Sequence, residues 1–197
     1  MKSGIKYKLN HRGMTLIELL VAMIFISLLG LMTVGGIGAI RRSYYRVVTY
    51  ANAQVVLSDT MAVMRDQLRY VTNITGNGTA EGTSFDNTNF GRFHYQSGSS
   101  ADNAGENGNT SGPGIRILYD DADDAEDTSA TVIADAMMKH RMYTKIDEAQ
   151  KITADADNNT ISVKIDVLST GIGAEKDQVL ASGELTVRTV NDLMVNP

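Results

Sequence analysis

The sequence contains no cysteine and only three histidines. Without cysteine the chain can form no disulfide framework, no zinc-thiolate site and no cysteine nucleophile. His11 lies near the amino terminus, and neither His94 nor His140 stands in a metal-binding or catalytic motif. Because no nucleophile, base and orienting group occur together, the sequence predicts a protein that is not an enzyme and needs no cofactor.

Positive charge is scarce outside the amino terminus. Four of the 18 basic residues, the first at Lys2 and the last at Arg12, stand in the first thirteen positions without an acid. The remainder carries the other fourteen basic residues against 23 acidic ones, a balance of −9. Such a remainder offers few cations to replace the counterions of nucleic-acid phosphates, so no nucleic-acid partner is expected.

An apolar run, MTLIELLVAMIFISLLGLMTVGGIGAI, fills residues 14–40 and contains one ionisable group, Glu18. About 20 apolar residues are enough to cross the hydrocarbon of a membrane. The basic leader slightly outweighs Arg41, Arg42 and Arg46 on the far side, which favours a cytoplasmic amino terminus. A cleaved secretory signal would have a shorter core followed by small residues. The run therefore predicts a single-pass segment, for which an uncleaved signal anchor is one explanation.

A plain anchor does not explain Glu18. A carboxylate inside a membrane costs about 3 kcal/mol on insertion scales, and the helix dipole softens this cost near a helix start. If the chain were cut after Gly13, the new amino group of Met14 would be a cation at the same depth in a neighbouring copy. That pair would neutralise both charges and would set the axial offset between neighbours.

The segment KLNHRG followed by MTLIELLVAMI resembles the class III signal sequence of type IV prepilins and of the pseudopilins of type II secretion and competence systems. The resemblance implies cleavage after Gly13 by prepilin peptidase, N-methylation of Met14 by the same enzyme, and use of Glu18 in filament assembly. The implied partners are this enzyme, other pilin or pseudopilin subunits, the inner-membrane assembly platform and membrane lipid. The implied location is the cytoplasmic membrane and then a cell-surface filament.

Two features depart from major pilins of the Gram-negative kind. Met14 replaces the usual first phenylalanine, and a chain without cysteine cannot form their carboxy-terminal disulfide. A minor pilin, a pseudopilin or a Gram-positive member fits better, and the sequence does not separate pilus, secretion and competence systems. The alternative is a monomeric membrane-anchored surface protein that keeps its leader and binds a ligand through the loops in residues 76–114.

The chain is expected to fold as an α+β, pilin-like protein in which a long amino-terminal helix packs on a small antiparallel β-sheet domain. Residues 1–13 form the leader, 14–40 the membrane or filament-core helix, 41–75 its amphipathic continuation, and 76–197 a β-rich domain. Apolar side chains spaced by three and four indicate the buried face of the continuation. They form two successive runs, the first of Tyr44, Val48, Ala51 and Val55, the second of Leu57, Met61, Met64, Leu68 and Val71.

Within residues 76–197 the clearest prediction is a hairpin in KITADADNNTISVKIDVL, where Ile161, Val163, Ile165 and Val167 share one face. Further strands are expected at 91–96, 115–120 and 183–191, the last of them closing the sheet. A long Gly/Asn/Ser loop is expected at 97–114 and a solvated acidic turn at 120–127. Residues 131–143 suit either a helix or a strand, and a short helix entering a strand is favoured.

Two weaker patterns leave alternatives open. Asp155, Asp157, Asn159 and Asp166 have part of the spacing of a calcium loop, but Thr160 replaces the required glycine, so a polar hairpin turn is favoured. Four glycines at positions 30, 35, 36 and 38 weaken the helix. They either permit close approach of another helix, as small residues four apart would, or reflect the frequency of glycine in membrane helices.

Overall fold

The computed structural model describes residues 15–99, 112–119, 128–132, 142–147, 152–169 and 177–196. Within these ranges the protein contains one helix, α1, and ten strands. The chain divides into one unit that ends at Arg46 and a second that begins at Val47. The predicted α+β class, with a long amino-terminal helix packed on antiparallel-rich sheets, is confirmed.

Helix α1 spans Leu16–Leu68 and is shorter at its carboxyl end than the sequence pattern predicted. The prediction continued the helix to residue 75, but residues from Val71 onward lie in strand β1, Val71–Gly76. Four of the six residues in this strand, Val71, Thr72, Ile74 and Thr75, are β-branched, and such side chains favour a pleated strand over a helix.

The buried face of α1 in the second unit consists of Ala53, Val56, Leu57, Thr60, Met64 and Leu68. Leu57, Met64 and Leu68 were predicted, whereas Tyr44, Ala51 and Val55 are exposed and were assigned to this face wrongly. Thr60 was missed because a hydroxyl reads as polar. Its Oγ1 donates to the Val56 carbonyl oxygen at 2.7 Å, which satisfies the hydroxyl inside the core.

A six-stranded sheet, here called sheet A, has the order β10-β1-β2-β3-β4-β5. Its remaining strands are β2 (Thr83–Asn87), β3 (Gly91–Gln96), β4 (Arg116–Tyr119), β5 (Thr128–Thr131) and β10 (Met194–Asn196). Strands β3 and β4 confirm the predicted strands at 91–96 and 115–120, but β2 was expected to be loop. Strand β10 was also not expected, and it pairs with β1 in parallel.

A second sheet, here called sheet B, contains β6 (Met142–Ile146), β7 (Thr153–Asp155), β8 (Thr160–Ser169) and β9 (Gln178–Arg188). The predicted hairpin is confirmed as β7 and β8, with Ile161, Val163, Ile165 and Val167 all buried. Strand β9 begins earlier than predicted and pairs with β8. The strands thus form two sheets, whereas one sheet had been expected.

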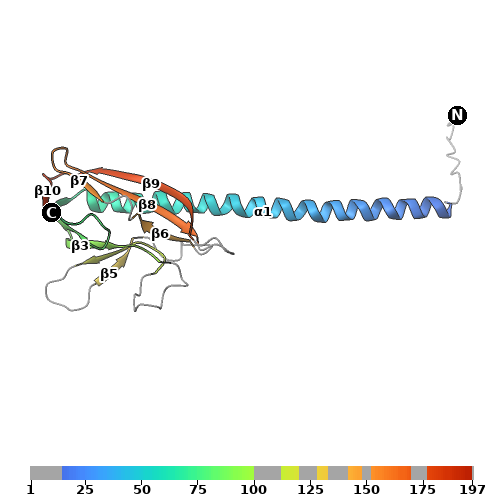
Figure 1. The fold of residues 1–197 in the computed structure, drawn as a ribbon, viewed down its shortest axis with the longest axis horizontal. Coiled ribbons are helices and arrows are strands. Elements are labelled where there is room, and N and C mark those ends of the chain that lie inside the picture. Colours follow the sequence, from blue (N-terminus) through green and yellow to red (C-terminus); the bar gives the residue numbers. More distant parts are fainter. Residues whose placement is uncertain are drawn as a thin grey trace, which may run out of the picture. The chain divides into compact units, whose positions relative to one another are not determined.

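The core of the second unit lies where α1 meets both sheets, as Figure 1 shows for β3 and for β8 and β9. From sheet A, the Tyr95 hydroxyl donates to Gln67 Oε1 at 3.1 Å. From sheet B, Gly183 approaches Met61 and Leu57 so closely that a Cβ atom there would displace the end of the Met61 side chain. The carboxyl half of α1 is thus an integral part of this unit.

Some predictions fall on residues outside the described ranges. These are the acidic turn at 120–127, most of the long loop at 97–114 and the helix expected within 131–143. The last two residues of the range 131–143, Met142 and Tyr143, are described and lie in β6. Both described ends of the long loop are bound to β6. Gly98 N donates to the Thr144 carbonyl oxygen at 2.9 Å, and Thr144 N donates to the Pro113 carbonyl oxygen at 2.9 Å.

An ion pair on sheet A gives a testable pH dependence. Arg92 Nε lies 2.7 Å from Asp86 Oδ1, and this hydrogen bond, helped by one from Asn73, holds the pKa of Asp86 below its usual range. A lowered pKa stabilises the fold above the unfolded value of about 3.9, and this contribution is lost as the pH falls through the folded value. Because both side chains are partly exposed, we expect Arg92→Gln to lower the free energy of unfolding by only about 0.5 kcal/mol at neutral pH.

The measurement is urea unfolding of the full-length chain in mild detergent, at neutral pH and at about pH 3. The difference between wild type and Arg92→Gln should shrink at the acidic pH. Arg188→Gln, at an exposed position at the end of β9, is the matched control and should show no such change. An Arg92→Gln effect that is equal at both pH values would show that the ion pair does not cause the pH dependence.

Candidate functional site

Of the site residues proposed from the sequence, Glu18 is the one that the structure describes, and it lies near the amino end of α1. Gly13 and Met14 lie outside the described residues, so their predicted processing stays a prediction. Glu18 is described and lies in the first turn of α1, where the positive end of the helix dipole stabilises its negative charge. Its position at the third residue of the helix also places it within reach of the residue that caps the helix.

Glu18 and Thr15 form a reciprocal capping arrangement. Thr15 N and Thr15 Oγ1 each donate to Glu18 Oε2 at 3.1 Å, and Glu18 N donates back to Thr15 Oγ1 at 3.4 Å. This is the capping box, in which Ser or Thr at the N-cap and Glu three residues later satisfy the free N–H groups of the helix start. Sequence reasoning missed Thr15, although the spacing T-x-x-E in TLIE carries the signal.

The capping box leaves Glu18 able to accept further hydrogen bonds. Both bonds from Thr15 end on Oε2, and an ionised carboxylate can accept about four hydrogen bonds over its two oxygens. A cation could therefore bind at Oε1 without disturbing the helix start. Glu18 can fix the first turn of its own helix and neutralise a charge on another chain at the same time.

The surface that follows Glu18 is apolar on every side. Leu31, Met32 and Val34 point in different directions around the helix, and each is more than 70% exposed. Glycines 30, 35, 36 and 38 also have open space where a Cβ atom would stand. Of the described part of the chain, α1 is the one helix that is long and apolar enough to cross a membrane. A helix that is apolar all round belongs inside a membrane or inside a bundle of other helices.

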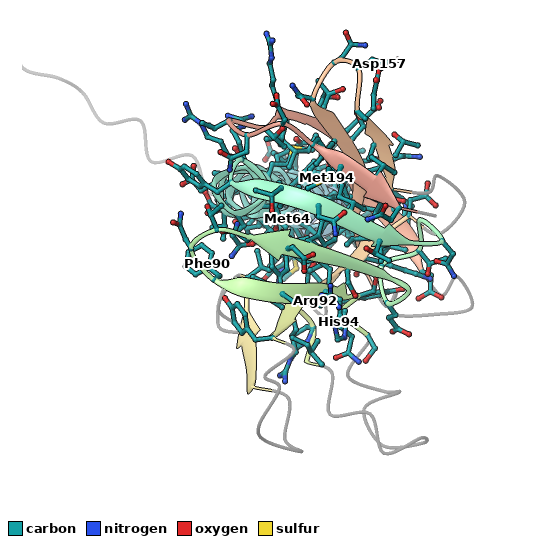
Figure 2. The ribbon with its side chains drawn as sticks, turned by 90° about the vertical axis from the view of Figure 1, so that its left-hand side faces the viewer. Met64, Phe90, Arg92, His94, Asp157 and Met194 are labelled. Atoms are coloured by element: carbon teal, nitrogen blue, oxygen red, sulfur yellow. The ribbon has the colours of Figure 1, made fainter. Side chains whose placement is uncertain are left out.

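The calcium-like residues form a hairpin turn instead of a cage. The carboxylate of Asp155 accepts hydrogen bonds from Asp157 N, Asn158 N and Asn158 Nδ2, which lowers its pKa. Asn159 has a φ of 52°, and its Oδ1 accepts a hydrogen bond from Leu193 N. Figure 2 shows Asp157 at the tip of the turn, pointing away from the strands. Over the described ranges, no three acidic or histidine side chains are grouped to hold a metal.

A shallow depression of about 140 Å³ is lined by Gln67, Phe90, Phe93, Ile117 and Tyr119. Its volume is below the roughly 300–1,000 Å³ of typical small-molecule sites. Phe90, in the turn between β2 and β3, is labelled at the left-hand side of the unit in Figure 2. The depression therefore adds little support to a ligand-binding function.

No family model, no curated protein and no solved structure matches this chain. The features that bear on function are therefore the residues and geometry of the helix start, together with the apolar surface that follows it.

Proposed function

We propose that the protein is a structural subunit of a type IV pilus-like filament, either a minor pilin or a pseudopilin. In this proposal prepilin peptidase removes residues 1–13 and methylates Met14, and the assembly platform of the inner membrane extracts the chain from the bilayer. The mature helix packs with other pilin or pseudopilin subunits. The role is assembly and not catalysis.

The observation that carries the proposal is a carboxylate placed at the start of a helix whose apolar side chains are exposed all round. A membrane accounts for the apolar surface between Leu16 and Ile40, but it does not account for a carboxylate among these residues. Packing of like helices accounts for both features. The helix of a neighbouring chain replaces the lipid, and the amino group that cleavage creates on its Met14 pairs with the Glu18 carboxylate.

The ion pair would act as a register device. An uncompensated charge inside an apolar bundle costs several kcal/mol, so a neighbour whose amino group misses Glu18 would be rejected. The capping box prepares the site because it holds the Glu18 carboxylate in one place before a neighbour arrives. The exposed glycines between residues 30 and 38 would let neighbouring helices approach closely, as small residues do in membrane bundles.

Processing gives the first test. We expect mass spectrometry of the protein from its native cell to find an amino-terminal peptide that begins with N-methylated Met14. Replacing Gly13 with valine should leave the leader attached, because the bulky side chain would block the cut. A matched change outside the predicted cleavage site, Gly4→Val, should be processed like wild type.

The opposite result points to the alternative function. A native peptide that still carries Arg12 and Gly13 would contradict the filament proposal. It would favour a monomeric, membrane-anchored surface protein, for which the apolar run is only an anchor.

A further inference from the structure

A cluster of cationic and aromatic side chains directly follows the apolar run and is not used by the proposed assembly mechanism. It occupies residues 41–46, RRSYYR, here called the basic segment, and all six residues are exposed. Three of its members are arginines, Arg41, Arg42 and Arg46. No aspartate or glutamate occurs between Glu18 and Asp59, so the local sequence supplies no counter-charge to these three cations.

The arrangement of the arginines on the helix favours binding of an anion. Arg42 and Arg46 are four residues apart and so lie on the same side of the helix, where two like charges destabilise it. Arg41 lies on the adjoining face of the helix and contacts Tyr45: its Nη2 donates to Tyr45 Oη at 3.4 Å, and its guanidinium carbon lies 5.5 Å from the centre of the Tyr45 ring. An anion that bridges the guanidinium groups of Arg42 and Arg46 would remove the repulsion between them.

The position of the basic segment indicates which anion. Arg41 follows Glu18 by 23 residues, which corresponds to about 35 Å along an α-helix. The hydrocarbon core of a bilayer is about 30 Å thick. If Glu18 lies at one boundary of this core, the basic segment lies at the level of the phosphate groups on the opposite side. Tyr44 and Tyr45, whose rings meet edge to face at 6.2 Å, belong to the residue type enriched at this boundary.

We propose that the basic segment binds the phosphate groups of anionic glycerophospholipids in the membrane leaflet opposite the leader. Arginine suits this role because its planar guanidinium group binds phosphate through two parallel hydrogen bonds. The lipid would hold the unassembled subunit at a fixed depth with Glu18 at the other boundary. This inference rests on the membrane-spanning part of the proposed function.

The test places the full-length chain, with carbon-13 in its arginine guanidinium groups, in vesicles of phosphatidylcholine and phosphatidylglycerol. Solid-state NMR then measures carbon dephasing by lipid phosphorus, which requires close contact between the two nuclei. We expect dephasing in the wild-type chain and loss of most of it in the triple variant Arg41→Gln, Arg42→Gln and Arg46→Gln.

The matched control removes three exposed arginines of the second unit, Arg65→Gln, Arg69→Gln and Arg188→Gln, and should keep the dephasing. Equal dephasing in both triple variants would overturn the proposal. So would dephasing by inorganic phosphate in a phosphorus-free detergent, because the ligand would then be free phosphate. Absence of dephasing in an inserted wild-type chain would overturn it as well and would point to carboxylates of a second copy as the partner.

Vesicle flotation after alkaline extraction separates this proposal from the one on which it rests. A wild-type chain that fails to remain with the vesicles would overturn both the spanning segment and the lipid site. A chain that remains inserted but shows no contact with phosphorus would overturn the lipid site alone.

Discussion

Glu18→Gln is expected to stop the chain from entering filaments while leaving its helix start, membrane insertion and leader removal unchanged. Glutamine also completes a capping box, so the hydrogen bonds with Thr15 can persist. What the variant loses is the negative charge. In an assembled filament this would leave the amino group of a neighbouring Met14 buried without a partner.

The expected loss is large because breaking one side of a buried ion pair costs about 3–5 kcal/mol. This corresponds to a reduction in incorporation of roughly a hundred- to a thousand-fold or more. The measurement is the amount of the chain in sheared, purified filaments relative to the amount in the membrane. Glu18→Ala, which removes both the charge and the capping interaction, should be at least as defective.

Thr15→Ala is the matched control because it removes the capping hydroxyl but keeps the charge. It should weaken the helix start by about 1 kcal/mol and still permit assembly. If Glu18→Gln were incorporated normally and Glu18→Ala were not, Glu18 would act through the capping box and the proposed ion pair would be wrong.

The elements that could be predicted from the sequence are those whose pattern of apolar and polar residues matches the burial seen in the structure. The hairpin of β7 and β8 was predictable because apolar and polar residues alternate along β8, and the two faces are buried and partly exposed as expected. The start of α1 was predictable because the apolar run is unbroken. In both cases local pattern and tertiary burial favour the same conformation, which is the condition under which sequence reasoning succeeds.

Elements were missed where polar residues face the core. Three buried residues of β2 are Thr83, Phe85 and Asn87, of which only Phe85 is large and apolar. Asn87 is accommodated because its Nδ2 donates to the Gln67 carbonyl oxygen at 2.7 Å, at the end of α1. Because this bond joins residues 20 positions apart, no local sequence pattern predicts it.

The carboxyl-terminal segment was unpredictable for a related reason. Strand β10 is three residues long, exposed, and paired in parallel with β1 at the edge of sheet A. The segment before it is held by Thr189 N, which donates to the Asn159 carbonyl oxygen at 2.8 Å, and by Val190 N, which donates to the Arg69 carbonyl oxygen at 2.9 Å. These bonds to the β7–β8 turn and to the end of α1 determine where β10 lies. The residues of β10 themselves show little of the sequence pattern that predicts a strand.

Phe93→Ala is expected to destabilise the second unit by about 3–5 kcal/mol, because it removes a ring from the centre of the core. Phe93 is 1% exposed, stacks on Phe85 with ring centres 5.3 Å apart, and meets Tyr95 edge to face at 5.4 Å. The alanine would leave a cavity that these neighbours cannot fill without leaving their own packing.

For a unit of this size the loss corresponds to a fall in Tm of roughly 6–20 °C. The measurement is thermal unfolding of the full-length chain in mild detergent, followed by the near-ultraviolet signal of its tyrosines. Phe90→Ala is the matched control, since Phe90 is 53% exposed and should change Tm little. Equal shifts in the two variants would show that Phe93 is not packed as described.

Phe93→Ala and Glu18→Gln are expected to separate folding from assembly. Met64 and Leu68 of α1 belong to the same buried cluster as Phe93, so loss of this core should loosen the carboxyl end of the helix as well as the sheets. Phe93→Ala should therefore lower Tm while leaving the proposed processing after Gly13 intact, because the proposed cleavage site lies in the other unit. Glu18→Gln should have the opposite profile, with unchanged Tm and lost incorporation. A Phe93→Ala chain that is stable but unprocessed would contradict this division of roles.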